Sequence, residues 1–344
     1  MNTQTGTYTI NKTKIITGIK IFFALTVIGS IVLLYRSSFS ESLIHLRSFK
    51  LQFLAIAVLL ILFDWLISGL RIFIYARKVY PSIRFFGCIR ASLANIFMGG
   101  VTPSQTAGGP GQIYVLYKEG MSILDATVVS FLGFVNTVIV LPVTGILINI
   151  YIKPDIGNDT LRVLSKTTFL LFGLIFLAAF LALISPGRFE SGVHAVLRRI
   201  PVVGRRFDRS KPLETLFESF KQYRNICWLF FRDNLHIVAA GISLTAVIYF
   251  NKFVIAWIVL QGLGIEYGFW QVIYFQLLLF LIFYFSPTPG ASGVAEVSTA
   301  LVMGHIVPGS FMGIFVVLWR FFTLYISMLA GAFVIVRYLL KKDN

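Results

Sequence analysis

Charged residues are scarce in this 344-residue chain. Asp, Glu, Lys and Arg make up 13% of it, whereas roughly 25% is usual in soluble domains. Hydrophobic residues account for 57%, and the mean hydropathy is +0.83. This balance excludes a soluble enzyme, a disordered chain and a fibrous repeat. It predicts an all-α, polytopic membrane protein.

Acidic residues are the scarcer of the two charged kinds, with 14 Asp and Glu against 30 Lys and Arg and a formal net charge of +16. The basic residues lie mainly between apolar spans. We therefore expect them to set the topology and to contact anionic phospholipid headgroups, not nucleic acid. The positive-inside rule places the basic segment 186–235 and both termini in the cytoplasm.

Motifs for enzyme chemistry are missing as well. The four histidines are scattered without the spacing of metal ligands, and the two cysteines do not indicate a disulfide framework. The chain has no Gly-x-Ser-x-Gly motif, no P-loop and no His-Glu-x-x-His motif. The sequence therefore predicts no catalytic residue, no metal and no cofactor, and it favours a transporter over an enzyme.

Six segments are long and apolar enough to span a membrane: 16–35, 51–75, 121–150, 168–185, 236–260 and 309–336. Two further apolar stretches, 83–118 and 268–307, are interrupted by turn residues, and each half is too short to span alone. Unwound backbone at membrane depth is tolerated where it is buried in protein or faces a wet cavity. Each interrupted stretch is therefore predicted to form a re-entrant helical hairpin.

The order span, span, broken hairpin, span occurs twice, in 16–150 and in 168–337. The first span of one half runs outward and that of the other inward. We therefore expect one membrane domain over 1–344, built from two inverted repeats. Inverted repeats with interrupted helices are typical of transporters whose site lies at the repeat interface. The alternative is chance similarity between two turns rich in Gly and Pro.

Both interruptions combine Thr-Pro with a cluster of glycines, which unwinds a helix. The helices that restart near Gly111 and Val294 present free backbone N–H groups, which suit a phosphate or carboxylate. Two hairpins that meet tip to tip would form a polar pocket, and packing kinks without a ligand are the alternative. The candidate substrate-binding residues are Thr102, Pro103, Gly108, Gly109, Gly111 and Gln112 in the first hairpin, and Thr288, Pro289, Gly290, Gly293 and Glu296 in the second.

Charged side chains inside apolar spans are further candidates, because they are costly there. Glu296 can pair with an ammonium headgroup, carry a proton, or cap its own helix. Arg320 lies too deep to reach the interface and is expected to pair with Glu296 or Asp64, or to bind a phosphate. Asp64 forms an ion pair or contacts the ligand. Arg90 reaches a headgroup or the cytoplasmic interface, and Lys252 is expected to extend outward as an anchor.

The two interruptions resemble the signatures of the lysylphosphatidylglycerol synthase transmembrane-region family, also called the flippase-like domain or UPF0104 family. The stretches are TPSQTAGGPGQIYVLYKEG at 102–120 and PTPGASGVAE at 287–296. Relatives often carry an acidic residue directly after the Gly-Gly of the first signature, where this chain has Pro110. The acidic residue of the second signature is retained as Glu296.

The resemblance implies a lipid flippase in the cytoplasmic membrane of a bacterium or archaeon. Its cargo would be a phospholipid, with aminoacylated phosphatidylglycerol as one candidate. In two-part members a C-terminal synthetase domain makes that lipid. This chain is expected to be a stand-alone member, for which a separately encoded lipid-synthesis enzyme is a candidate partner. The alternatives are a membrane transferase, or an accessory subunit, that acts on polyprenyl-linked or glycolipid substrates.

Overall fold

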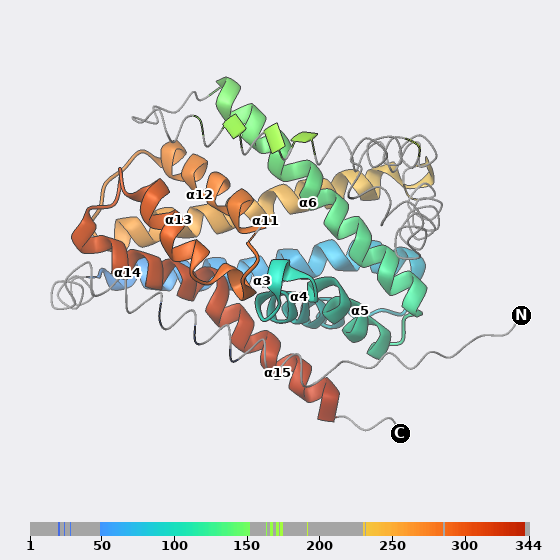
Figure 1. Ribbon diagram of the computed structural model, residues 1–344. Helices are drawn as coiled ribbons and strands as arrows, with labels where there is room; N and C mark the ends of the chain where they lie inside the picture. The colour runs from blue at the N-terminus through green and yellow to red at the C-terminus, as the bar shows by residue number, and fades with distance from the viewer. Residues whose placement is uncertain are drawn as a thin grey trace, which may run out of the picture.

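The computed structural model describes residues 49–151, 232–284 and 286–340, together with isolated residues elsewhere. Every element in these ranges is a helix, which confirms the all-α prediction (Figure 1). The predicted spans 16–35 and 168–185 lie outside the described residues, apart from isolated positions. The same holds for the basic segment 186–235 as far as residue 231.

Four stretches of the described chain are long and apolar enough to cross a membrane, which confirms the membrane class. They follow the predicted spans closely, because each is a continuous apolar run with turn residues at its ends. The last one is interrupted by a π-helical turn. They are α3 (Leu51–Val79), α6 (Ile123–Tyr151), α11 (Leu235–Gly262) and Gly309–Leu340.

The last stretch contains a π-helical turn at Phe321–Tyr325, between α14 (Gly309–Arg320) and α15 (Ile326–Leu340). The sequence predicts a single regular span over 309–336, so this turn is an unexpected feature. A π-turn inserts extra backbone into a helix and is frequent at functional sites. Here it begins directly after Arg320, the one charged residue in the middle of this stretch.

Each predicted interruption separates two helices that are too short to cross a membrane. In the first, α4 (Phe85–Gly100) leads through the turn η1 (Pro103–Gln105) to α5 (Gly108–Lys118). The second helix therefore restarts three residues earlier than the predicted Gly111. A residue with positive φ, Ser104 at 49°, allows the chain to reverse in η1.

The second interruption has the same form. Here α12 (Phe269–Tyr284) leads through η2 (Pro289–Ala291) to α13 (Val294–Met303), which starts where the sequence predicts. Gly290 occupies the position that matches Ser104 and has a φ of 57°. The described elements of the two halves thus follow the same order, whereas the inverted relation between complete halves stays a prediction.

The tips of the two broken hairpins contact each other in the middle of the molecule (Figure 1). Both the backbone N–H and the hydroxyl of Ser104 donate to the carbonyl oxygen of Ser286, each at 3.2 Å. The unwound backbone of one hairpin is therefore partly satisfied by the other, as membrane depth requires. This contact fixes the tips relative to each other and to the helices that surround them.

Close helix contacts hold the hairpins in place. Helix α15 packs along α4, where a Cβ on Gly331 would lie 2.2 Å from the carbonyl oxygen of Leu93. Helix α11 packs along α3, where a Cβ on Gly241 would lie 1.9 Å from the Tyr75 hydroxyl. Small residues allow such approach between membrane helices, whose association depends on van der Waals contact.

Candidate functional site

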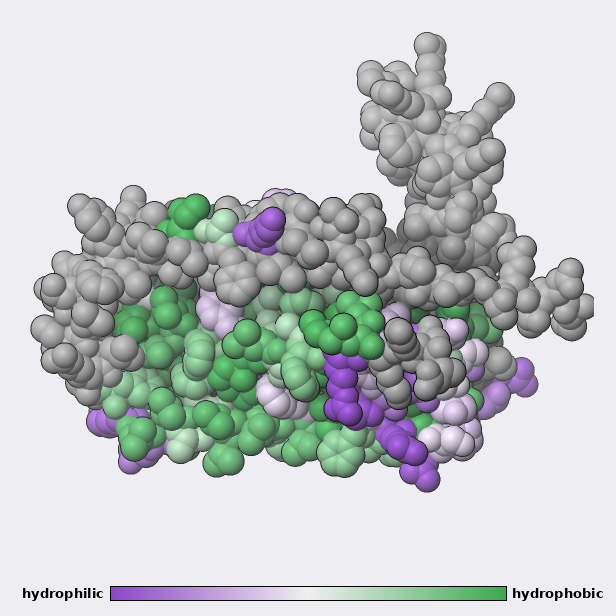
Figure 2. All heavy atoms as spheres, turned by 90° about the horizontal axis from the view of Figure 1, so that it is seen from below, coloured by the Kyte–Doolittle hydropathy of each residue, from purple (hydrophilic) through white to green (hydrophobic). Residues whose placement is uncertain are grey.

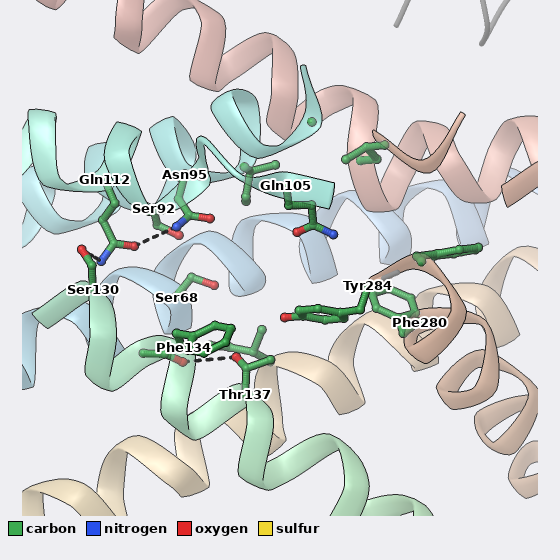
Figure 3. A pocket seen from close by; sticks show the side chains of 18 of the residues that line it. Ser68, Ser92, Asn95, Gln105, Gln112, Ser130, Phe134, Thr137, Phe280 and Tyr284 are labelled. Atoms are coloured by element: carbon green, nitrogen blue, oxygen red, sulfur yellow. Dashed lines mark hydrogen bonds between the residues drawn. The ribbon is translucent and has the colours of Figure 1, made fainter. Parts of the chain in front are cut away.

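A cavity of about 720 Å³ lies between the hairpin tips and helices α3, α6, α11 and α14 (Figure 3). Its volume is in the range of sites that hold small molecules or cofactors. Hydroxyl, amide and aromatic side chains line it together, so its surface is mixed polar and apolar. The polar members are Ser68, Ser92, Asn95, Ser104, Gln105, Thr106, Gln112, Thr127, Ser130, Thr137, Tyr249, Tyr284 and Thr323.

One end of the cavity is a chain of amide and hydroxyl groups (Figure 3). The Asn95 amide donates to Gln112 Oε1 at 3.2 Å, and Gln112 Nε2 donates to Ser130 Oγ at 3.0 Å. Gln112 therefore links α4 to α6 from its place on α5. This network fixes the start of α5, where Gly108 and Gly109 also line the cavity.

The opposite end is aromatic. Figure 3 shows Phe280 and Tyr284 of α12 facing the amide network across the cavity, with the Tyr284 hydroxyl pointing into it. The hydroxyls of Tyr249 and Tyr284 are 2.9 Å apart and hydrogen-bonded. Phe280 packs edge-on against Tyr249 with a ring-centroid distance of 6.0 Å. The aromatic end thus combines apolar ring surface with tyrosine hydroxyls that can form hydrogen bonds.

Three of the described residues that line the cavity are cations, and two of these are paired. Lys252 Nζ lies 3.0 Å from Asp64 Oδ2, and Arg320 Nη1 lies 3.5 Å from Glu296 Oε1. The third, Arg71, forms no ion pair with any carboxylate that the structure describes. The five groups therefore carry three positive and two negative charges, which leaves one positive charge in excess.

Arg71 is only partly satisfied by its neighbours. Its Nη1 donates to Thr245 Oγ1 at 3.3 Å, a long contact for a hydrogen bond. Its Nε is buried and has no hydrogen-bond partner among the described atoms. An arginine has five donors in a rigid planar arrangement that matches phosphate and carboxylate oxygens. Arg71 is therefore the group in this cavity best placed to bind an anion.

Arg320 lines the cavity, and its partner Glu296 is buried behind the cavity wall. Glu296 Oε2 accepts from the Gly293 N–H at 2.6 Å, which caps the start of α13. Arg320 Nη2 donates to the carbonyl oxygen of Gly290 at 2.7 Å, and the guanidinium lies 5.5 Å from the Tyr325 ring centre. Arg320 thus connects α14 to the second hairpin tip. Of the alternatives for Glu296, the capping role is present in the structure, and of those for Arg320, the pairing with Glu296 is present.

The predicted site residues divide into two groups. Five line the cavity: Gly108, Gly109, Gln112, Gly290 and Arg320. Nine lie outside its lining: Thr102, Pro103, Gly111, Thr288, Pro289, Gly293, Glu296, Asp64 and Arg90. Substrate contact by any of them stays a prediction.

The two threonines of the Thr-Pro pairs stabilise the turns. Thr102 Oγ1 donates to the Met98 carbonyl oxygen at 2.8 Å and accepts from the Ala107 N–H at 3.1 Å. Thr288 Oγ1 donates to the Ser292 carbonyl oxygen at 2.7 Å. These bonds satisfy backbone groups that the interruption of the helices leaves open.

One charged residue, Lys252, differs from expectation. Lys252 does not extend outward; it turns inward to Asp64, so the anchor interpretation is wrong. The ion pair offsets the cost of burying both charges. Arg90 pairs with Glu119 at 2.7 Å and lies outside the cavity, and its expected reach to a headgroup or to the cytoplasmic interface stays a prediction.

The sequence reasoning missed Arg71. It lies eight residues before the end of α3, about 12 Å along the helix at 1.5 Å per residue. At that depth, an arginine side chain is long enough to be interpreted as one that extends to the membrane–water interface. A charged residue inside a span is nevertheless a functional candidate by default, and that signal was available.

Together these features define a class: a multi-pass helical membrane protein with two broken hairpins that enclose a polar, positively charged cavity. Residues 16–331 match the family described as "Lysylphosphatidylglycerol synthase TM region", and the chain belongs to that family. This confirms the membership expected from the two signatures. A relative from Archaeoglobus fulgidus, described as a UPF0104 membrane protein, is 25% identical over 302 residues, covering 85% of this chain and 88% of the relative. No solved structure matches the chain.

Proposed function

We propose that this protein is a lipid flippase that moves a phospholipid headgroup through the cavity of about 720 Å³. The observation that carries the proposal is Arg71, which forms no ion pair with any carboxylate in the described ranges and lies in a polar cavity enclosed by membrane helices. Every phospholipid has a phosphate, and arginine binds phosphate through two parallel hydrogen bonds. Arg71 would hold the phosphate while the acyl chains stay in the surrounding lipid.

The cavity wall supports this assignment. A headgroup that leaves water must exchange its hydration for other hydrogen bonds, because an unsatisfied polar group in an apolar medium is costly. The network of Asn95, Gln112 and Ser130 offers such bonds next to the N–H groups of Gly108 and Gly109, which have no acceptor within α5. Phe134 lines the cavity and is also 54% exposed, so the wall is continuous with a surface that faces lipid.

Membership of this family narrows the choice of candidate lipids. The family description refers to lysylphosphatidylglycerol synthase, so an aminoacylated phosphatidylglycerol is the first lipid to test. The proposal places the protein in a bacterial or archaeal cytoplasmic membrane, with both termini in the cytoplasm. A separately encoded lipid-synthesis enzyme would supply the cargo. The alternative functions are a transferase and an accessory subunit, and neither requires the protein itself to move lipid between leaflets.

The test is leaflet exchange in liposomes that contain the purified protein. Headgroup-labelled phosphatidylglycerol, lysylphosphatidylglycerol and phosphatidylcholine are followed with a quencher that does not cross the membrane. Arg71→Gln removes the phosphate ligand, and Arg77→Gln is the matched control, because Arg77 lies on the same helix outside the cavity. A hydrogen bond to a charged group contributes about 1.5–3 kcal/mol, which is roughly tenfold to a hundredfold in rate.

We expect exchange of at least one lipid by the wild-type protein, slowed by that factor in Arg71→Gln and unchanged in Arg77→Gln. Equal rates in the two variants would contradict the role of Arg71. Folded protein that exchanges no lipid would contradict the flippase proposal. Chemical modification of the added lipid would instead favour the transferase.

A further inference from the structure

A second cavity, of about 550 Å³, lies where α3 ends and α4 begins and where α5 and α15 both end. It shares no lining residue with the first cavity. Among the described residues that line it, four are cations, Arg84, Arg90, Lys118 and Arg337, and one is a carboxylate, Glu119. Four positive charges and one negative charge leave an excess of three.

The carboxylate is already engaged by neighbouring groups. Glu119 Oε1 accepts from Arg90 Nη2 at 2.7 Å and also from the Tyr338 hydroxyl. Gly87 gives Glu119 room, because a Cβ there would lie 2.8 Å from Glu119 Oε2. This network neutralises Arg90 and connects α4, the end of α5 and α15. The excess charge therefore lies on the other basic residues.

Arg84 and Arg337 are the most available of these cations. Both are exposed, and neither forms an ion pair with a carboxylate in the described ranges. Arg84 also precedes the first residue of α4, where the helix dipole adds positive potential. Arg90 contributes a buried Nε that has no hydrogen-bond partner among the described atoms. All of these features favour an anion.

Apolar side chains beside the cavity indicate that the anion is part of a lipid headgroup. Phe86 is 68% exposed and lies two residues after Arg84, while Val336 precedes Arg337 and is 51% exposed. Figure 2 shows hydrophilic residues gathered near the end of α15 on a face that is otherwise mostly apolar. In a membrane protein such a boundary lies at the headgroup level.

We infer that this second cavity binds the phosphate of an anionic phospholipid, with Arg84 and Arg337 as its ligands and the acyl chains on the neighbouring apolar residues. The site is separate from the cavity of the proposed function. It fixes a lipid at the end of the helix bundle through α4, α5 and α15. Its existence does not depend on whether the protein moves lipid.

The test measures lipid binding directly. The protein is placed in nanodiscs of phosphatidylcholine that contain increasing fractions of spin-labelled phosphatidylglycerol, and the immobilised fraction is recorded. The double variant Arg84→Gln/Arg337→Gln removes two ligands but leaves the Arg90–Glu119 pair intact. The control is Arg77→Gln/Lys78→Gln, which removes two exposed charges at the end of α3 that do not line the cavity.

We expect the affinity for phosphatidylglycerol to fall about thirtyfold in Arg84→Gln/Arg337→Gln, since each cation near a membrane surface contributes about fivefold. The control should change it little. An equal loss in both double variants would overturn the inference, because it would indicate diffuse surface charge. Calorimetry with inorganic phosphate forms the second arm: saturable binding that competes with the lipid would assign the cavity to a soluble phosphate compound and refute the lipid assignment.

Discussion

The buried pair of Glu296 and Arg320 gives the sharpest prediction about stability. Their side chains are 2% and 4% exposed, and the charges are 3.5 Å apart. At an effective dielectric constant near 20, two unit charges at that distance attract by about 5 kcal/mol before desolvation is counted. Glu296→Gln keeps an oxygen for the Gly293 N–H but removes this attraction, which leaves Arg320 as a buried charge. We expect the free energy of unfolding to fall by about 3–5 kcal/mol.

Removing the other partner by Arg320→Met should lower the free energy of unfolding by a similar amount, because it leaves Glu296 buried and unpaired. In the double variant Glu296→Gln/Arg320→Met, the loss of unfolding free energy should be smaller than the sum of the two single losses by roughly 3 kcal/mol, since no buried charge remains. Unfolding by SDS titration in mixed micelles, followed by circular dichroism, measures these values, and Glu266→Gln at an exposed position is the control. Additive losses would show that the two charges do not interact and would refute the pairing.

Two further predictions concern the helix contacts. Asp64→Asn should lower the free energy of unfolding by about 3 kcal/mol, because it leaves the Lys252 charge buried without its partner. The double variant Asp64→Asn/Lys252→Met should recover most of that loss, because no buried charge remains. Equal losses in the single and double variants would contradict this pairing. Gly331→Ala should cost about 1–3 kcal/mol by forcing α15 away from α4. Gly309→Ala, where a Cβ meets nothing within 4 Å, is its control, and equal melting temperatures would count against the close contact.

Sequence reasoning located the elements well because apolar length and helix breakers are local properties. The spans 51–75, 121–150 and 236–260 each match a helix within a few residues. The Thr-Pro and glycine clusters marked both turns, since proline and glycine act on their own backbone. The π-turn after Arg320 was not predicted, because no proline or glycine marks it.

The candidate site was harder to predict, because it depends on which helices meet. Arg71, Ser130 and Tyr284 lie on three different helices, and nothing in the local sequence says that they share a cavity. The partners of the buried charges posed the same problem: Asp64 pairs with Lys252, 188 residues away in the chain. Arg320 was assigned correctly to an interior position because a charge in the middle of an apolar run has few other places to go.

The central claim is that a lipid headgroup passes through the cavity, and filling the cavity tests it most directly. Gly109 lines the cavity, and a Cβ added there meets no atom within 4 Å. Gly109→Leu therefore places a bulky side chain at the cavity and narrows the passage without a clash at its own Cβ. Gly309→Leu is the control, because Gly309 has the same open surroundings but lies outside the cavity lining. We predict that leaflet exchange falls to the protein-free rate in Gly109→Leu and stays at the wild-type rate in Gly309→Leu. Wild-type exchange by folded Gly109→Leu protein would contradict the account.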